Sequence, residues 1–432
     1  MPLITASTPF ATIAASLRSG QLDLTTYINN ACHRIDGYEP DLQALVPEPG
    51  RKEQLLKEAA TLQKRFPDPA SRPPLYGVLF GVKDVFYADG LPTRGGSQLP
   101  PDLFKESEAI CVTRLRDAGA LLLGKTVTTE FAYFEPGPTR NPHNLQHTPG
   151  GSSSGSAAAV AAGFCQIALG TQTIGSTIRP AAYCGIVGFK SSYGRIPTDG
   201  LILCSASLDT IGFFTQDVTG IALVAPLLCN NWQPATVPST PVLGVPDGPY
   251  LSQASPEGRA VFENHLTLLE HAGYRIQRIE ALHDIDDIAN RHRRIVAAEM
   301  AQVHATWFAR YEALYRPRTA DIIRQGQRIH SEELEAARDG RAVLRNELEG
   351  LMDQHGVDLW ISPAAPGPAP EGISTTGDPA MNLPWTHAGL PAIALPAGRA
   401  KNGLPLGLQV AGKFMADEQL VTWAKPMAEV LA

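Results

Sequence analysis

Residues 149–160 read PGGSSSGSAAAV, and residues 170–180 read GTQTIGSTIRP. In the first stretch a serine-rich loop opens a predicted helix of small residues. A helix N-terminus offers free N–H donors and a partial positive charge, which favour a developing anion. In the second stretch a glycine-flanked turn presents Ser176. Each serine alone is typical of a helix cap or a tight turn. Together they predict a closely packed site, because Gly, Ser and Ala let backbones approach each other.

The sequence around these stretches alternates predicted helices with short apolar runs. Helices are predicted over residues 24–35 and 110–118, and strands over 76–82, 120–123, 358–363 and 392–396. Repeated helix and apolar strand predict an α/β fold, with a mixed, largely parallel central sheet covered by helices on both faces. No boundary divides residues 1–432, so we expect one domain. Residues 258–355 are charged and rich in Ala, Glu and Arg, and are predicted to form a helical wall of that domain.

The composition of the 432 residues excludes several classes of protein. Hydrophobic residues make up 44%, and the net charge is −7, which excludes intrinsic disorder and argues against binding to nucleic acid. No apolar run approaches the ~20 residues that span a bilayer, and the start lacks the pattern of a secretory signal. The six cysteines show no CxxC spacing. We therefore expect reduced thiols, a cytoplasmic protein, and no metal site or membrane association.

Two motif matches do not fit their surroundings. Residues 119–126, GALLLGKT, match a phosphate-binding loop, but the variable positions Ala-Leu-Leu-Leu are themselves predicted to be strand. Residues 151–155, GSSSG, match the nucleophile elbow of α/β-hydrolases, but a polar loop precedes them where a strand is required. A nucleotide-binding protein with a phosphate-binding loop is thus an alternative function that the sequence disfavours.

The two serine-bearing stretches resemble the amidase signature family, whose members hydrolyse or transfer amide groups. The family's GGSS(G/S)G run is matched from Gly150, and the spacing between Ser152 and Ser176 is 176 − 152 = 24 residues, as in the family pattern. The family's lysine, in a G-(V/I)-K-D context, is matched by GVKD at residues 81–84. Weaker similarities extend the resemblance over most of the chain, which implies the amidase signature fold and no cofactor.

The resemblance implies a Ser–Ser–Lys triad. Ser176 is the implied nucleophile, Ser152 the bridging serine on a cis Gly151–Ser152 peptide, and Lys83 the base. The chemistry is consistent, because a serine hydroxyl is a weak nucleophile until a base takes its proton. Lys83 ends an apolar predicted strand, where desolvation favours the neutral amine.

The resemblance also implies an oxyanion hole made of backbone N–H groups. These are the N–H groups of Thr173, Ile174, Gly175 and Ser176. Many members have Gly where this chain has Ile174, and a β-branched residue restricts the backbone there. We therefore expect an oxyanion hole here that is narrower than in the members with Gly at this position.

Arg179 is the main candidate for substrate binding. Many members place Arg two residues after the nucleophile, whereas this chain has Ile178 there and Arg179 one residue later. This wording resembles malonamidase-type enzymes, in which the Arg binds a substrate carboxylate through two charge-assisted hydrogen bonds. The alternative is that Arg179 holds a helix or loop through backbone carbonyls. Gln172 and Tyr133 are further candidates for the pocket.

The expected function is hydrolysis of a small linear amide to a carboxylate and ammonia through an acyl-enzyme. A substrate with its own carboxylate is expected, either malonamate-like or a carboxylated ureide. The alternative is a glutamine- or asparagine-hydrolysing amidotransferase subunit of a tRNA-charging complex. The Ser-Thr-Ile-Arg wording at residues 176–179 argues against it, since such subunits usually carry Gly-Gly-Ser-Ile-Arg. The sequence is compatible with a homodimer and also with binding of a small accessory subunit.

Overall fold

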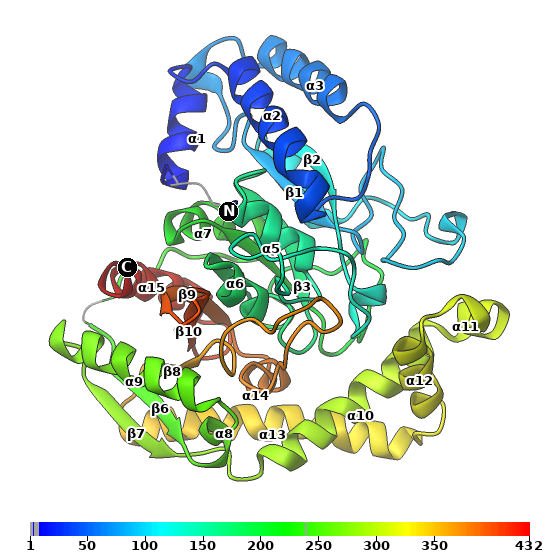
Figure 1. Ribbon diagram of the computed structural model, residues 1–432. Coiled ribbons are helices and arrows are strands. Elements are labelled where there is room, and N and C mark those ends of the chain that lie inside the picture. Colours follow the sequence, from blue (N-terminus) through cyan, green and yellow to red (C-terminus); the bar gives the residue numbers. More distant parts are fainter. Residues whose placement is uncertain (1–2, 4–7, 238–239) are drawn as a thin grey trace.

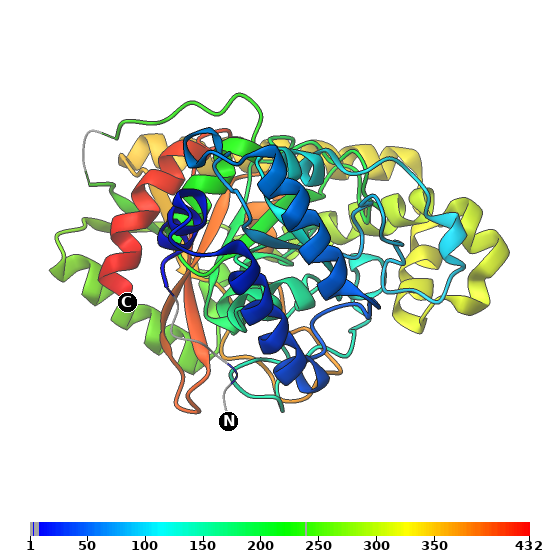
Figure 2. The same ribbon diagram turned by 90° about the horizontal axis from the view of Figure 1, so that it is seen from above.

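Ten strands form one continuous sheet at the centre of the computed structural model, which describes residues 3, 8–237 and 240–432 (Figures 1 and 2). Across the sheet the strand order is β2-β1-β3-β5-β4-β9-β10-β8-β6-β7. The strands span Leu79–Lys83 (β1), Leu121–Thr126 (β2), Ile167–Gln172 (β3), Val187–Lys190 (β4), Thr210–Thr215 (β5), Leu243–Asp247 (β6), Ile276–Glu280 (β7), Leu359–Pro363 (β8), Ala392–Arg399 (β9) and Pro405–Ala411 (β10).

The sheet is parallel at its two ends and antiparallel in its middle. β1 pairs in parallel with β2 and β3, and β6 pairs in parallel with β7 and β8. The other five of the nine strand pairs among the described residues are antiparallel. The prediction of a mixed sheet is confirmed, but the expectation that it is largely parallel is wrong. The reason is that β5 inserts between β3 and β4, and that β9 and β10 form a hairpin, a connection that only antiparallel strands allow.

Helices cover the sheet on both faces, as predicted. α5 and α6 pack on each other and on the sheet, and α7 packs on β4 and β5 as well as against α1, α4 and α15 (Figure 1). α10, α12 and α13 pack together below them. The helices span Phe10–Ser19 (α1), Leu24–Leu42 (α2), Arg51–Arg65 (α3), Ile110–Asp117 (α4), Ser154–Ala161 (α5), Ile178–Cys184 (α6), Val218–Leu228 (α7), Pro249–Ser252 (α8), Pro256–His271 (α9), Ile285–Val303 (α10), Ala305–Tyr311 (α11), Pro317–Gly326 (α12), Ser331–His355 (α13), Leu383–Ala388 (α14) and Asp417–Leu431 (α15).

The segment at 258–355 is not wholly helical. It contains most of α9 and all of α10 to α13, but β7 lies within it and forms the last strand of the sheet. α10 and α13 run along the lower side of the molecule in Figure 1, and α11 and α12 extend from their right end. This part of the chain therefore contributes both to the sheet and to the wall that lies beside it.

The motif at residues 119–126 lies in a strand and not in a phosphate-binding loop. β2 occupies Leu121–Thr126, and all of its residues are buried. Lys125 donates a hydrogen bond to Thr93 Oγ1 at 2.7 Å and lies 3.5 Å from a carboxylate oxygen of Asp84. Its ammonium group is therefore held inside the protein, away from any external phosphate.

Small residues let α5 pack tightly beside the sheet. All eight of its residues are buried, and a Cβ atom at Gly155 would lie 2.1 Å from the carbonyl oxygen of Ala44. Only glycine permits this approach. The serine-rich loop that precedes α5 is thereby fixed close to the strand ends that carry the site.

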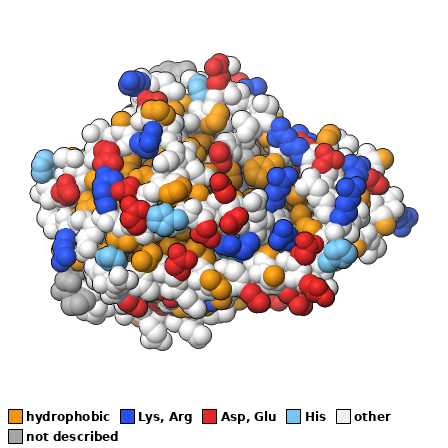
Figure 3. Space-filling model, turned by 90° about the horizontal axis from the view of Figure 1, so that it is seen from below, with side chains coloured by type: hydrophobic (Ala, Val, Ile, Leu, Met, Phe, Trp, Pro, Cys, Tyr) orange, Lys and Arg blue, Asp and Glu red, His pale blue; other side chains and the backbone are white. Residues whose placement is uncertain are grey.

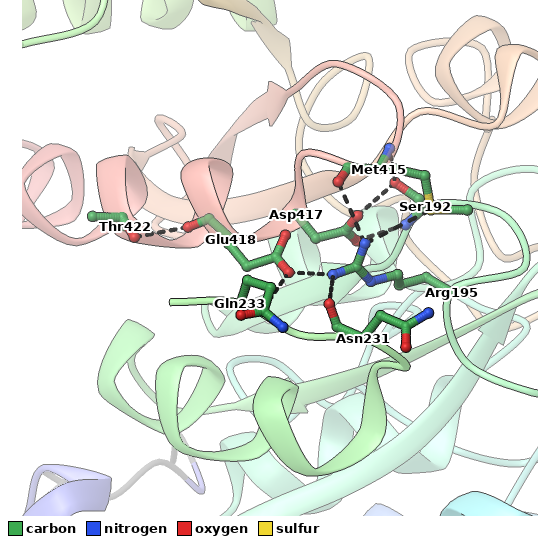
Figure 4. Close-up of polar contacts among 8 residues, drawn as sticks. All are labelled: Ser192, Arg195, Asn231, Gln233, Met415, Asp417, Glu418 and Thr422. Carbon is green, nitrogen blue, oxygen red and sulfur yellow. Dashed lines mark hydrogen bonds and ion pairs between the residues drawn. The ribbon is translucent and has the colours of Figure 1, made fainter. Parts of the chain in front are cut away.

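The C-terminal helix α15 is tied to the loop that follows β4 by a buried polar network (Figure 4). Ser192 donates to Asp417 from both its backbone nitrogen, at 2.7 Å, and its hydroxyl, at 2.6 Å. Arg195 forms an ion pair with Glu418. Since Asp417 and Glu418 lie in the first turn of α15, they also complement the positive end of the helix dipole.

The six cysteines are all buried with free thiols, as the absence of paired spacing predicted. Among the described residues, no helix combines the length and the apolar character needed to traverse a bilayer.

Candidate active site

Lys83 is fully buried at the end of β1. The strand LFGVK is buried along its whole length, as expected of a strand covered on both faces. The Lys83 Nζ atom lies 2.6 Å from Ser152 Oγ and 2.8 Å from Thr171 Oγ1. The lysine is thus held between a hydroxyl of the serine-rich loop and a hydroxyl of β3.

Burial lowers the pKa of Lys83 to about 7, and the negative charge of Asp209 partly opposes this shift. A large fraction of the amine is therefore neutral near neutral pH, and a neutral amine accepts a proton. Asp209 is itself held by Thr173 Oγ1, which donates to it at 2.5 Å, and by the backbone nitrogen of Cys204 at 2.7 Å.

Ser152 follows a cis peptide bond with Gly151, as the resemblance implied. The preceding Gly150 has a φ of 84°, and a Cβ atom there would lie 2.8 Å from the Cα atom of Pro180 in α6. Glycine is required for two reasons: other residues disfavour the left-handed region, and a Cβ atom would collide with Pro180. The serine-rich loop therefore lies directly against the first turn of α6.

Gln172 fixes the loop that carries Ser176. Its Oε1 atom accepts hydrogen bonds from the backbone nitrogens of Thr177 at 2.8 Å and Ile178 at 3.0 Å. Its Nε2 atom donates to Thr386 Oγ1 at 2.9 Å. Gln172 is fully buried, and both ends of its amide are engaged by the protein. Gln172 is therefore not among the residues that line the inner pocket, and its side chain supports the Ser176 loop instead.

Ser176 lies in a small pocket, called here the inner pocket. Its cavity volume is about 20 Å³. Residues 173–176, Ser152, Arg179 and Tyr133 all line it, together with Ala132, Phe134, Cys204, Val296, Thr376 and Pro379. The structure therefore brings both predicted serines, the predicted oxyanion-hole residues and two of the three predicted substrate-binding residues together, with Lys83 behind Ser152.

The predicted oxyanion hole has free donors. The backbone N–H groups of Ile174, Gly175 and Ser176 form no hydrogen bond with any described part of the chain. The carbonyl oxygen of Ile174 accepts from Thr386 Oγ1 at 2.6 Å, which fixes the orientation of this peptide. Preorganised N–H groups of this kind stabilise an oxyanion that forms beside them.

Arg179 holds two backbone segments together and also lines the inner pocket. Its Nε atom donates to the Thr376 carbonyl oxygen, and its Nη2 atom to the Gly151 carbonyl oxygen, both at 2.8 Å. The guanidinium thus holds two backbone segments. Its Nη1 atom is buried without a partner in the described chain, and the residue lines the inner pocket. Burial lowers the pKa of Arg179, although an arginine keeps its charge in proteins.

Tyr133 lines the inner pocket from the segment that follows Glu130–Ala132. Burial raises the pKa of its phenol to about 12, so the hydroxyl stays protonated at neutral pH and can donate a hydrogen bond. No sequence pattern predicted that Thr171 would contact Lys83 or that Thr376 would line the inner pocket. Thr171 is an ordinary strand residue, and Thr376 comes from a loop 200 residues beyond Ser176.

No group of three or more His, Cys, Asp or Glu residues is placed to hold a metal ion within residues 8–237 and 240–432.

Known proteins resemble this chain over nearly its whole length. The family described as Amidase matches residues 26–421. A glutamyl-tRNA(Gln) amidotransferase subunit from Oleidesulfovibrio alaskensis is 31% identical, over 95% of this chain and 94% of the relative. The corresponding protein from Lysinibacillus sphaericus is also 31% identical, over 94% of this chain and 92% of the relative.

Solved structures share the fold. A crystal structure of an amidase is 30% identical with a TM-score of 0.89, over 98% of this chain and 100% of that one. The peptide amidase of Stenotrophomonas maltophilia is 27% identical with a TM-score of 0.83, over 100% and 98%. The predicted family is confirmed: the chain belongs to the amidase signature family and is an enzyme that acts on C–N amide bonds.

Proposed function

We propose that the chain hydrolyses a linear amide that carries its own carboxylate, and releases ammonia through an acyl-enzyme on Ser176. Neutral Lys83 accepts the proton of Ser152, whose oxygen accepts the proton of Ser176, as the latter attacks the amide carbonyl. The backbone N–H groups of residues 174–176 stabilise the oxyanion. Its collapse transfers the relayed proton to the leaving nitrogen and expels ammonia. Water then attacks the ester through the same relay and releases the carboxylate.

The unpaired Nη1 atom of Arg179 is the observation that supports the carboxylate. A buried cation without a counter-ion costs free energy, and an anion bound in the inner pocket would offset that cost. A guanidinium matches a carboxylate geometrically as well as electrically. Arg179 is also close to the nucleophile loop, since a Cβ atom at Gly175 would lie 3.0 Å from Nη1.

The curated relatives favour a second candidate, the glutamine-hydrolysing subunit of an amidotransferase for glutamyl-tRNA(Gln). Their similarity extends over nearly the whole chain and supports this candidate more directly than it supports a malonamate-like substrate. Glutamine is itself an amide with a carboxylate, so Arg179 is compatible with both. The Ser-Thr-Ile-Arg sequence at residues 176–179 favours the independent hydrolase. Partner subunits belong to the second candidate only.

Ammonia release by the purified chain separates the two candidates. The panel contains malonamate, a carboxylated urea, glutamine, asparagine and neutral amides of the same size, with Ser176→Ala as blank. Preference for the acidic amides supports the first candidate. Turnover of glutamine that requires partner subunits supports the second. Equal rates on acidic and neutral amides contradict the carboxylate assignment.

A further inference from the structure

The inner pocket adjoins a second, larger cavity, called here the outer chamber. The two share Tyr133, Phe134, Ile174, Val296 and Pro379 as lining residues. The inner pocket, at about 20 Å³, has room for little more than one water molecule, which needs about 10–15 Å³. The outer chamber has a cavity volume of about 540 Å³, within the range of roughly 300–1,000 Å³ typical of ligand pockets. The inner pocket therefore has no room for a long acyl chain beyond the atoms that contact Ser176 and Arg179.

The walls of the outer chamber are largely apolar. Phe134, Val296 and Pro379 line the part nearest the inner pocket. Ile322 of α12 and Leu383 of α14 continue this apolar lining. Such walls favour the hydrocarbon part of a ligand.

Two exposed guanidinium groups, those of Arg293 on α10 and Arg318 on α12, also line the chamber. Arg293 Nη2 donates to Gln325 Oε1 at 3.2 Å, and Arg318 Nη1 donates to the Phe134 carbonyl oxygen at 3.0 Å. Among the described residues, neither guanidinium forms an ion pair with a carboxylate.

Among the described residues, the acidic residue of the lining, Asp321, forms no ion pair with Arg293 or Arg318. Asp321 lies 2.9 Å from Arg324 Nη1, with which it forms an ion pair. In Figure 3, Lys and Arg side chains lie among Asp and Glu side chains in the right half of the view, the side on which α11 and α12 lie in Figure 1. The chamber therefore combines an apolar wall with two positive charges that have no counter-ion.

We propose that the outer chamber binds the acyl part of the substrate beyond the amide, as an apolar segment whose far end carries an anionic group held by Arg293 and Arg318. This inference rests on the proposed function, in which the leaving group is ammonia, so that only the acyl part is long enough to enter the chamber. In a malonamate-sized substrate the carboxylate would contact Arg179, whereas in a longer substrate it reaches Arg293 and Arg318 instead. The substrate class is then the terminal monoamide of a longer dicarboxylic acid, rather than a three-carbon acid amide.

A series of amides tests this assignment. The terminal monoamides of dicarboxylic acids from malonamate to suberamate are compared with neutral alkyl amides of the same lengths. We expect kcat/KM to rise at least about tenfold from malonamate to suberamate, and suberamate to exceed the neutral amide of equal length. Arg293→Gln and Arg318→Gln should each raise KM for suberamate about tenfold, the effect of about 1.4 kcal/mol of binding. Neither should change kcat, or KM for the neutral amide, by more than about twofold.

Arg294→Gln is the matched control. Arg294 is the next residue on α10 and is also exposed, but it does not line the outer chamber. It should leave every parameter unchanged. Calorimetric binding of suberate, the reaction product, is measured on the same proteins, so that the assignment is judged independently of turnover. Weaker binding in Arg293→Gln and Arg318→Gln supports it.

Two results would overturn the assignment: malonamate is the best substrate, or suberate binds equally well to the wild type and to both variants. Failure of the proposed function looks different. In that case no amide yields ammonia, or Ser176→Ala is as active as the wild type, whatever the suberate binding shows.

Discussion

The amine nitrogen of Lys83 and the hydroxyl oxygen of Ser152 lie 2.6 Å apart in the protein interior. Thr171 Oγ1 contacts the same nitrogen at 2.8 Å. In both contacts the Lys83 nitrogen is the donor. In the proposed mechanism the neutral amine instead accepts the proton of Ser152 with its lone pair, so that a lysine serves as the base without a histidine.

The pH dependence of kcat/KM should report the protonation of Lys83. Its pKa in the folded protein is lowered to about 7, so the protonated form, which cannot act as base, dominates at lower pH. We expect kcat/KM to fall about tenfold per pH unit below about pH 6 and to level off above about pH 8. Steady-state rates between pH 5 and 9 measure this. A rate that is flat down to pH 5 would exclude Lys83 as the base.

Lys190 provides a control for that pH profile. It is also a buried lysine at a strand end, and burial lowers its pKa to about 7, but its Nζ atom donates to the Ser191 carbonyl oxygen away from the inner pocket. Lys190→Met should keep the ascending limb of the profile. Loss of the limb in that variant would assign it to Lys190.

Removing the amide of Gln172 should disturb catalysis without touching the substrate. Gln172→Leu leaves the backbone nitrogens of Thr177 and Ile178 without their acceptor. We expect a loss of about 1–3 kcal/mol in the free energy of unfolding, the usual cost of buried unsatisfied donors. Because the Ser176 loop loosens, kcat should fall at least about tenfold while KM changes less. Urea unfolding and steady-state kinetics measure the two effects. An unchanged kcat would restrict Gln172 to a role in stability.

Arg179→Met should change substrate preference as well as stability. The variant loses the contacts to the Gly151 and Thr376 carbonyl oxygens, so the protein should unfold at lower urea concentration. The ratio of kcat/KM on an acidic amide to that on a neutral amide of equal size should fall at least about tenfold, because a charge-assisted hydrogen bond contributes about 1.5–3 kcal/mol. Equal losses on both amides would make Arg179 purely structural.

The network at α15 should matter for stability and not for catalysis. Asp417→Asn replaces the charged acceptor of two hydrogen bonds from buried Ser192, and should lower the free energy of unfolding by about 1.5–3 kcal/mol. Asp353→Asn, which breaks an exposed ion pair with Lys413, should cost less than about 1 kcal/mol. Urea titrations of both variants test this, and equal effects would contradict it. The kcat of each variant should stay at the wild-type value.

The sequence predicted those parts of the site that local pattern encodes. Ser152, Ser176 and Lys83 lie in motifs of fixed spacing, and the structure places both serines in one pocket with Lys83 behind them. The sequence did not predict that Gln172 supports the Ser176 loop and does not line the inner pocket, because a polar residue at the end of a strand gives no sign of whether it faces a pocket or a neighbouring loop. Thr376 and the outer chamber depend on tertiary packing of distant segments, which periodicity does not encode.

The sheet shows the same division between local and long-range information. The short apolar runs predicted several strands, including β2 and β8, close to their observed bounds. The relative direction of neighbouring strands was predicted less well, because it depends on the path of the connection that leads the chain from one strand to the next. β5 enters the sheet between two strands that precede it in sequence, an arrangement set by long-range pairing.

The central claim is that Ser176 carries the acyl group, and intact-mass spectrometry of acid-quenched enzyme tests it most directly. The enzyme is mixed with an acidic amide and quenched within milliseconds, and the adduct is located by peptide mapping. We expect the mass of one acyl group on the peptide containing Ser176, and neither adduct nor ammonia release in Ser176→Ala. An adduct on another residue, or steady-state turnover by Ser176→Ala, would contradict the assignment.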